Sequence, residues 1–205
     1  MTSTFNARRF ERAIALFDAA NALDPNLESA NGKEWPKELL YAQRMTEMQE
    51  RFVPDASEAV RLACRAQHIQ RWTSPRTDYT MNKDGYQQWR TALYRFHSDT
   101  AGALMKEAGY DEEMIERVKK IIGKRGLKVN PETQAMEDVA ALAFIEHYMA
   151  DFAAKKGDYS EDKWLVIIRK TWKKMSDQGR AFAVSGKIRL PEHLVPLILK
   201  AVHEG

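Results

Sequence analysis

The sequence predicts an all-α protein that forms a single compact domain of about eight helices. No alternation of apolar and polar residues continues for more than four residues, whereas apolar residues recur at helical spacing along most of the chain. Six of the seven prolines lie at predicted helix edges. No repeat or long linker divides the 205 residues, so we expect one domain over residues 1–205.

The composition excludes several classes of protein. Charged residues make up 30% of the chain but leave a net charge of only +3, which permits an anionic ligand without indicating a dedicated nucleic-acid binder. A single cysteine, Cys64, excludes an intramolecular disulfide and a multi-thiolate zinc site. The first residues lack a signal-peptide pattern, and no run of about 18 apolar residues occurs. We therefore expect a cytoplasmic protein without a membrane partner.

Two helices are predicted at the start of the chain, over residues 5–23 and 36–53, each followed by a proline. Asp18, Asn21 and Asp24 share roughly one face of the first helix. This spacing suits either a polar cleft or turn chemistry at the helix end, and favours turn chemistry.

The stretch from Ala63 to His97 concentrates ionisable and aromatic side chains. A helix over residues 57–72, opened by a capping box, carries a contiguous polar patch that consists of Gln67, His68 and Arg71. After a crossing rich in turn residues, the helix over 86–107 places Arg90 and His97 on one stripe, two turns apart. This pattern indicates a functional site rather than part of the hydrophobic core.

Four further helices are predicted over residues 111–122, 131–152, 160–175 and 191–203. The helix over 131–152 is strongly apolar, but its first half carries Glu137 and Asp138. These acids are either a pair of ligands in a binding site or residues that only stabilise the helix, because the helix dipole favours acidic residues near a helix start.

A divalent metal ion is one interpretation of these residues. His68, His97 and Asp138, or Glu137 in place of Asp138, would supply two nitrogens and one oxygen from three helices. The alternative is that each histidine is an ordinary core imidazole bonded to a nearby polar group.

Phosphate binding is a second interpretation, because the planar guanidinium group donates two parallel hydrogen bonds. The candidates are Arg44, Arg71, Arg76 and Arg90, whereas Arg65 fits a solvated face better. Trp72 and Trp89 either stack a base or pack as core wedges. The KTWKKMS run adds Lys170 and Lys174, although lysine near a helix end is favourable by itself.

The chain resembles a known family along nearly its whole length. The segments that carry the resemblance are DAANALDPN at 18–26, PKELLYAQRM at 36–45, PDASEAVRLACRAQHIQRW at 54–72, SPR at 74–76, GYQQWRTALYRFH at 85–97, QAMEDVAALAFIEHY at 134–148 and KTWKKMS at 170–176. Together they are similar to the family catalogued as domain of unknown function 4202.

A more distant resemblance is to the HD-domain superfamily of helical, metal-dependent phosphohydrolases. QHIQRW resembles its His-Asp segment with His68 in place, FHSDTAGALMKEAGY aligns His97 with a further histidine, and QAMEDVAALAF supplies the final acid, Asp138 or Glu137. Tyr41 and Ile69 stand where the first histidine and the aspartate are expected, so the ligand set is degenerate. The resemblance implies an HD-like core over 36–152, flanked by helices at 5–23 and 160–203.

The leading hypothesis is an HD-like phosphohydrolase that acts on a small phosphorylated or nucleotide-like substrate. His68, His97 and Asp138 would bind the divalent metal, Glu137 would orient a ligand or act as a base, and Arg90 would stabilise the developing charge. Substrate contacts would come from Arg44, Gln67, Arg71, Trp72, Arg76, Trp89, Lys170 and Lys174. The alternative is a non-catalytic module that binds an anionic ligand or RNA through its Arg/Trp cluster, and a third is an interaction scaffold with core tryptophans.

Overall fold

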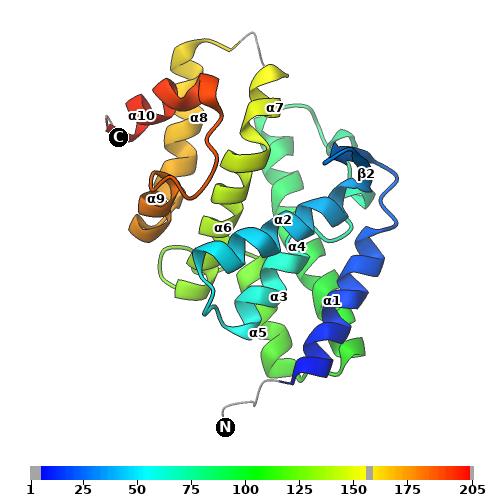
Figure 1. The fold of residues 1–205 in the computed structure, drawn as a ribbon. Coiled ribbons are helices and arrows are strands. Elements are labelled where there is room, and N and C mark those ends of the chain that lie inside the picture. Colours follow the sequence, from blue (N-terminus) through cyan, green and yellow to red (C-terminus); the bar gives the residue numbers. More distant parts are fainter. Residues whose placement is uncertain (1–5, 156–158, 204–205) are drawn as a thin grey trace.

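The computed structural model describes residues 6–155 and 159–203, and confirms the predicted all-α class. The described residues form ten α-helices, three single-turn 3-10 helices (η1–η3) and one small hairpin (Figure 1). The α-helices are α1 (Ala7–Asn21), α2 (Lys37–Phe52), α3 (Glu58–Ala66), α4 (Lys83–Ala108), α5 (Glu112–Ile122), α6 (Pro131–His147), α7 (Met149–Ala154), α8 (Glu161–Lys174), α9 (Asp177–Ala183) and α10 (Val195–His203). The remaining elements are β1 (Leu27–Ala30), β2 (Lys33–Pro36), η1 (Arg71–Thr73), η2 (Arg76–Asp78) and η3 (Glu192–Leu194).

Short polar side chains fix where most helices begin. A side-chain oxygen of the residue before the helix accepts a hydrogen bond from a backbone N–H of the first turn, which satisfies a donor that the helix itself leaves unpaired. The residues that cap in this way are Asn6, Ser57, Asn82, Asp111, Asn130, Ser160 and Ser176. The predicted N-termini at Ser57, Asp111 and Asn130 are therefore confirmed.

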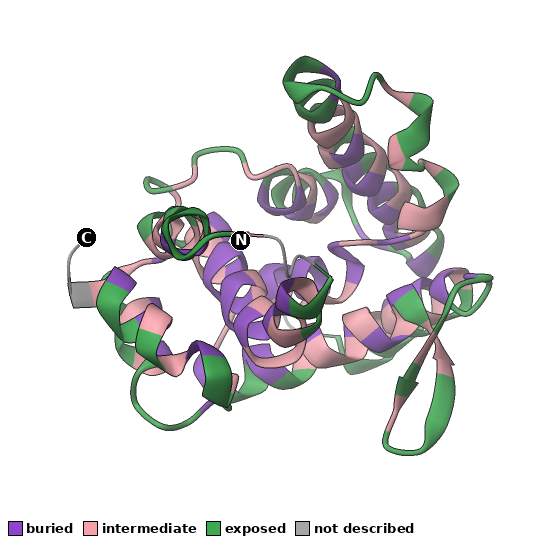
Figure 2. Ribbon diagram, turned by 90° about the horizontal axis from the view of Figure 1, so that it is seen from above, coloured by how far each residue is buried: buried purple, intermediate pink, exposed green. Residues whose placement is uncertain are grey.

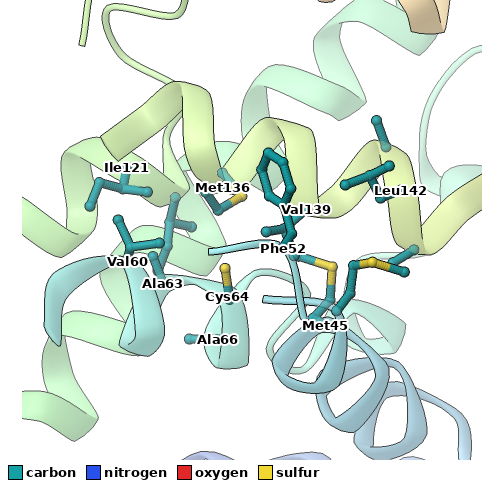
Figure 3. Packing of buried hydrophobic residues seen from close by; sticks show 14 of the residues in the cluster. Met45, Phe52, Val60, Ala63, Cys64, Ala66, Ile121, Met136, Val139 and Leu142 are labelled. Carbon is teal, nitrogen blue, oxygen red and sulfur yellow. The ribbon is translucent and has the colours of Figure 1, made fainter. Parts of the chain in front are cut away.

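The core is built around α3, which packs against α1, α2, α5 and α6. Small residues on α3, including Ala59, Ala63 and Ala66, are fully buried and allow these neighbours to approach closely. The Cys64 thiol lies among apolar side chains of α2, α3 and α6 (Figure 3), and burial raises its pKa well above the ordinary value. This is a structural thiol rather than a nucleophile.

The C-terminal helices lie on the opposite side of the molecule from α1: α8 and α9 pack against α6, and α10 packs against α8 (Figure 1). Buried residues line the inner faces of the helices, whereas the hairpin projects from the helical body and is largely exposed (Figure 2). No helix in the described ranges is long and apolar enough to cross a membrane.

The hairpin is an element that was not predicted from the sequence. Residues 27–36 pair antiparallel across Asn31 and Gly32, which have φ angles of 51° and 73°. Two central residues with positive φ define the turn that best matches the twist of a tight hairpin. The sequence carries this turn signal, but each strand has only four residues, too few to display an alternating pattern.

Two predicted helices are also interrupted. The helix predicted over 57–72 ends at Ala66, and Gln70 adopts a left-handed conformation with φ of 50°. Its backbone N–H donates to the Asn21 side chain at 2.9 Å, so the turn depends on a contact from α1. The helix predicted over 131–152 breaks at Tyr148, where no glycine or proline marks the break.

Candidate functional site

Two adjoining cavities lie between α2, α4, α6 and the segment after α3. The smaller one, which we call the polar compartment, has a volume of about 110 Å³ and is lined by Gln67, His68, Arg71, Tyr86, Trp89, Arg90, Leu93, Tyr94, His97, Ile122 and Lys124. The larger one, the aromatic compartment, has about 500 Å³ and is lined by Lys37, Glu38, Tyr41, His68, Arg71, Tyr86, Phe144, Tyr148 and Phe152. Three residues, His68, Arg71 and Tyr86, line both compartments. We call the two together the cleft.

The premature end of α3 places His68 in the wall between the compartments. Its ring stacks on Tyr41, with centroids 4.1 Å apart, and its Nδ1 lies 3.4 Å from Oε2 of Glu38. The Tyr41 hydroxyl donates to the side-chain oxygen of Gln67. Burial lowers the pKa of His68 well below its usual value, and the nearby cations of Arg71 and Lys124 lower it further, so the imidazole is neutral at pH 7.

His97 is held in one tautomer by the backbone. Its Nδ1 lies 2.8 Å from the carbonyl oxygen of Ile69, which can only accept, so Nδ1 carries the hydrogen and Nε2 carries a lone pair. The residue is 3% exposed, and Nε2 is buried without a hydrogen-bond partner among the described residues. Burial and the neighbouring His68 lower the pKa of His97 to about 3. His97 lines the polar compartment, so its imidazole supplies an unpaired acceptor beside this cavity.

Cationic side chains gather around the same compartment. The Arg71 guanidinium lies over the Trp89 ring at 5.2 Å, and its buried Nε has no hydrogen-bond partner within the described part of the chain. Arg90 donates to the Tyr94 hydroxyl, and Lys124 pairs with Glu137 on α6. Uncompensated positive charge therefore remains near the cavity, which favours an anion.

Two of the residues that line the cleft are held by the structure rather than free to bind. Trp89 donates its indole N–H to the carbonyl oxygen of Ser74 at 2.9 Å, which fixes the crossing segment against α4. Gln67 accepts from Tyr41, as described above. Both predicted binding residues line the polar compartment, where they shape its walls.

Glu38 is the one carboxylate that lines the aromatic compartment. It lies in the first turn of α2, and its backbone N–H donates to Asp24 at 3.0 Å, which anchors the start of the helix. The residue is 5% exposed, and burial raises the pKa of its carboxyl group to about 7 despite the nearby Arg71 and Lys37 cations. A group that titrates near neutral pH inside a cavity is typical of a functional site.

The substitution Glu38→Gln should stabilise the protein in a pH-dependent way. Because the folded-state pKa lies above the unfolded value of 4.5, the stability linked to this carboxyl is present below pH 4.5 and is lost as the pH rises through about 7. We expect the free energies of unfolding of the two proteins to differ little at pH 4.5, and the variant to gain up to about 3 kcal/mol at pH 8. Urea unfolding at both pH values measures the difference, and a pH-independent difference would contradict the assignment.

Asp138 does not point into the cleft as a metal ligand. Its carboxylate accepts from the backbone N–H of Ser176 at 2.8 Å, from the Ser176 hydroxyl at 2.5 Å and from the Gln134 amide at 3.0 Å. A Cβ atom on Gly179 would lie 2.8 Å from the Asp138 carboxyl carbon, so the acid is packed against the start of α9. Asp138 thus fixes α9 to α6. The sequence did not predict α9, and this role was therefore missed.

The structure does not assemble the predicted metal triad. Among residues 6–155 and 159–203, no group of three or more His, Cys, Asp or Glu side chains is arranged to hold a metal ion. The rings of His68 and His97 are neighbours, with centroids 5.9 Å apart, but Asp138 is engaged with Ser176 and Glu137 with Lys124. The residues present do not fit the expected ion, and a divalent metal remains a prediction from sequence.

Two of the predicted phosphate-binding arginines have structural partners. Arg76 donates to the backbone carbonyl oxygens of Tyr79 and Thr80, at 2.9 and 2.7 Å, and so closes the loop before α4. Arg44 pairs with Glu28 of the hairpin and lies over the Tyr148 ring at 5.0 Å. Neither lines the polar or the aromatic compartment.

The remaining predicted binding residues lie around the cleft rather than in it. Trp72 is half-buried in η1, and Lys170 is exposed on α8. Lys174 is half-buried near Glu137, Arg90 and Lys124; burial lowers its pKa, and the two cations add to that effect. Lys174 therefore contributes positive charge to the neighbourhood, whereas Trp72 and Lys170 line neither compartment.

Sequence reasoning missed three residues that matter to the cleft. Glu38 resembles an ordinary acid in the first turn of a helix, and Lys124 follows a helix-ending glycine. Tyr86 is 42% exposed yet lines both cavities. Lys124 has a positive φ of 55°, which sets the direction of the chain after α5. Lysine is not a residue type that predicts a positive φ, so this turn has no signal in the sequence.

The fold and the cleft define an all-α protein with a cationic cavity joined to an aromatic one. Within that class, the chain belongs to the family described as "Domain of unknown function (DUF4202)", whose family model matches residues 11–198. The chain matches no curated protein and no solved structure. The resemblance to the HD-domain superfamily thus remains a prediction.

Proposed function

We propose that the cleft binds a small phosphorylated, nucleotide-like molecule and that the chain hydrolyses the phosphate ester. Arg71 carries this proposal. Its half-buried side chain lines both compartments, and its Nε is buried without a hydrogen-bond partner in the described residues. A phosphate in the polar compartment would supply the missing acceptors.

The charges around the polar compartment support phosphate over a neutral ligand. Arg90 and Lys124 line the same cavity as Arg71, and Lys174 lies nearby, whereas Glu137 balances only one of these cations. The two histidines are neutral when the cavity holds no ligand. The residual positive charge therefore favours a phosphate dianion over a neutral ligand.

A proton acceptor beside the phosphate supports hydrolysis. A bound dianion would raise the pKa of His97, which opposes the effect of burial, and Nε2 of this cavity-lining residue has no hydrogen-bond partner in the described residues. In the proposed step, water adds to phosphorus, the bond between phosphorus and the ester oxygen breaks, and Nε2 accepts the proton of the water. The leaving alkoxide is protonated by solvent.

Calorimetry with inorganic phosphate and pyrophosphate tests the binding, and phosphate release from a panel of phosphate monoesters tests the hydrolysis. We expect millimolar or tighter binding, and a loss of about tenfold or more in affinity for Lys124→Met. The matched control is Lys106→Met, which replaces an exposed lysine on α4. Binding at the same affinity to the Lys124 variant, or no binding to either anion, would overturn the proposal.

The same assays distinguish the other hypotheses. Phosphate release only after addition of Mn²⁺ or Mg²⁺ supports the predicted metal, whereas release in the presence of a chelator contradicts it. Binding without release under any condition indicates a non-catalytic module for anionic ligands. RNA binding that weakens steeply with salt, together with no affinity for the small anions, would favour the RNA alternative.

A further inference from the structure

The aromatic compartment is the part of the cleft that the phosphate does not use. Its walls include the rings of Tyr41, Tyr86, Phe144, Tyr148 and Phe152, and its volume of about 500 Å³ exceeds that of the polar compartment several times. The rings of Tyr41 and Tyr148 lie 5.7 Å apart and tilted, and those of Phe144 and Phe152 lie 6.1 Å apart, edge to face. Such walls suit a flat ring system.

One carboxyl group lies among these rings, in a wall that also contains Lys37, His68 and Arg71. Glu38 is buried in α2, and its Oε2 lies 3.4 Å from Nδ1 of His68, which is neutral. No lysine or arginine within ion-pair distance neutralises the Glu38 carboxylate in the described residues. A carboxylate enclosed in this way has two acceptor oxygens available and no donor.

We propose that the aromatic compartment holds a nitrogen heterocycle and that Glu38 is the specificity-determining residue that recognises two adjacent N–H groups on its edge. This inference rests on the proposed function, because the phosphate in the polar compartment places the ring. Arg71, His68 and Tyr86 join the two cavities and would lie beside the linker between phosphate and ring. The ligand class is thus a phosphorylated, guanine-like compound.

The protonation state of the carboxyl decides which ring edge it matches. An ionised carboxylate only accepts and pairs with the ring N–H and amino group of guanine, whereas a protonated carboxyl also donates and matches the amino group and ring nitrogen of adenine. Burial of Glu38 places this change near neutral pH. The ionisable groups that face it are Asp24, Lys37, Tyr41, His68, Arg71, His97 and Tyr148.

The experiment compares GMP, AMP, phenyl phosphate and inorganic phosphate by calorimetry at pH 8 and pH 6. At pH 8 we expect the chain to bind GMP about tenfold or more tightly than AMP, and at pH 6 the preference should shrink or reverse. The variant Glu38→Gln has one donor and one acceptor at every pH, so it should prefer AMP at both. The control Glu50→Gln, at an exposed position on the same helix, should behave like the parent.

The probes separate this inference from the proposed function. Phenyl phosphate carries a ring without N–H groups, so its unchanged binding to Glu38→Gln shows that the variant is folded and the phosphate site is intact. Equal affinity for GMP and AMP at both pH values, with inorganic phosphate still bound, would overturn the recognition role of Glu38 and leave the proposed phosphate site standing. No binding of any of the four compounds overturns the proposed function itself.

Discussion

Replacing Arg71 with methionine is expected to weaken phosphate-ester binding about 100-fold while leaving the fold intact. The guanidinium is the only group with an unpaired buried donor that lines both compartments in the described residues, so two charge-assisted hydrogen bonds to phosphate would be lost. Methionine retains an unbranched, flexible apolar side chain that fills most of the same space beside Trp89. Calorimetry with the tightest ligand of the panel measures the loss.

The matched control is Arg95→Met, which replaces an arginine on α4 whose side chain is 88% exposed and pairs with Asp99 one helical turn away. This control should change the affinity by less than about twofold, because surface ion pairs contribute little. The melting temperatures of both variants should stay close to that of the parent. If Arg71→Met binds as tightly as the control, the guanidinium does not hold the anion and the site lies elsewhere.

Replacing Asp138 with alanine should lower the free energy of unfolding by about 3 kcal/mol. The buried carboxylate accepts three hydrogen bonds, two of them from Ser176 at the start of α9, and the substitution leaves the Ser176 N–H and the Gln134 amide without this acceptor. Urea unfolding measures the change. The control Asp78→Ala, at an exposed position in η2, should cost less than about 0.5 kcal/mol.

The same variant separates the two roles that have been considered for Asp138. As a metal ligand it would be dispensable for folding, and its loss would remove binding of Mn²⁺ without a change in unfolding free energy. As the anchor of α9 it is needed for stability at every metal concentration. A fully stable Asp138→Ala protein would therefore contradict the structural role.

The sequence determined most of the fold because helix signals are local. Apolar spacing together with caps such as Ser57, Asp111 and Asn130 located α3, α5 and α6 at their N-termini. Most of the helix breaks could not be predicted in this way. α3 ends where Asn21 of a distant helix accepts from Gln70, and α6 ends at Tyr148 in the wall of the aromatic compartment.

The candidate site was likewise predictable only where it depends on local helical spacing. Gln67, His68, Arg71, Arg90 and His97 were predicted from two local helical faces, and the structure brings all five to the polar compartment. The carboxylate of the predicted third corner, Asp138, instead accepts hydrogen bonds from Ser176 at the start of α9. Periodicity shows which side chains share a face of one helix, but not what another helix places opposite them.

The sequence by itself determined the helical class, most helix starts and the crowding of arginine and histidine between Ala63 and His97. Only the tertiary structure decided what those side chains face. It paired Arg76, Lys124 and Glu137 with other residues, left Nε of Arg71 and Nε2 of His97 without hydrogen-bond partners in the described part of the chain, and placed Glu38 beside His68. The physical reason is that a hydrogen bond or a buried charge depends on distance in space, and the groups that satisfy it come from helices far apart in the chain.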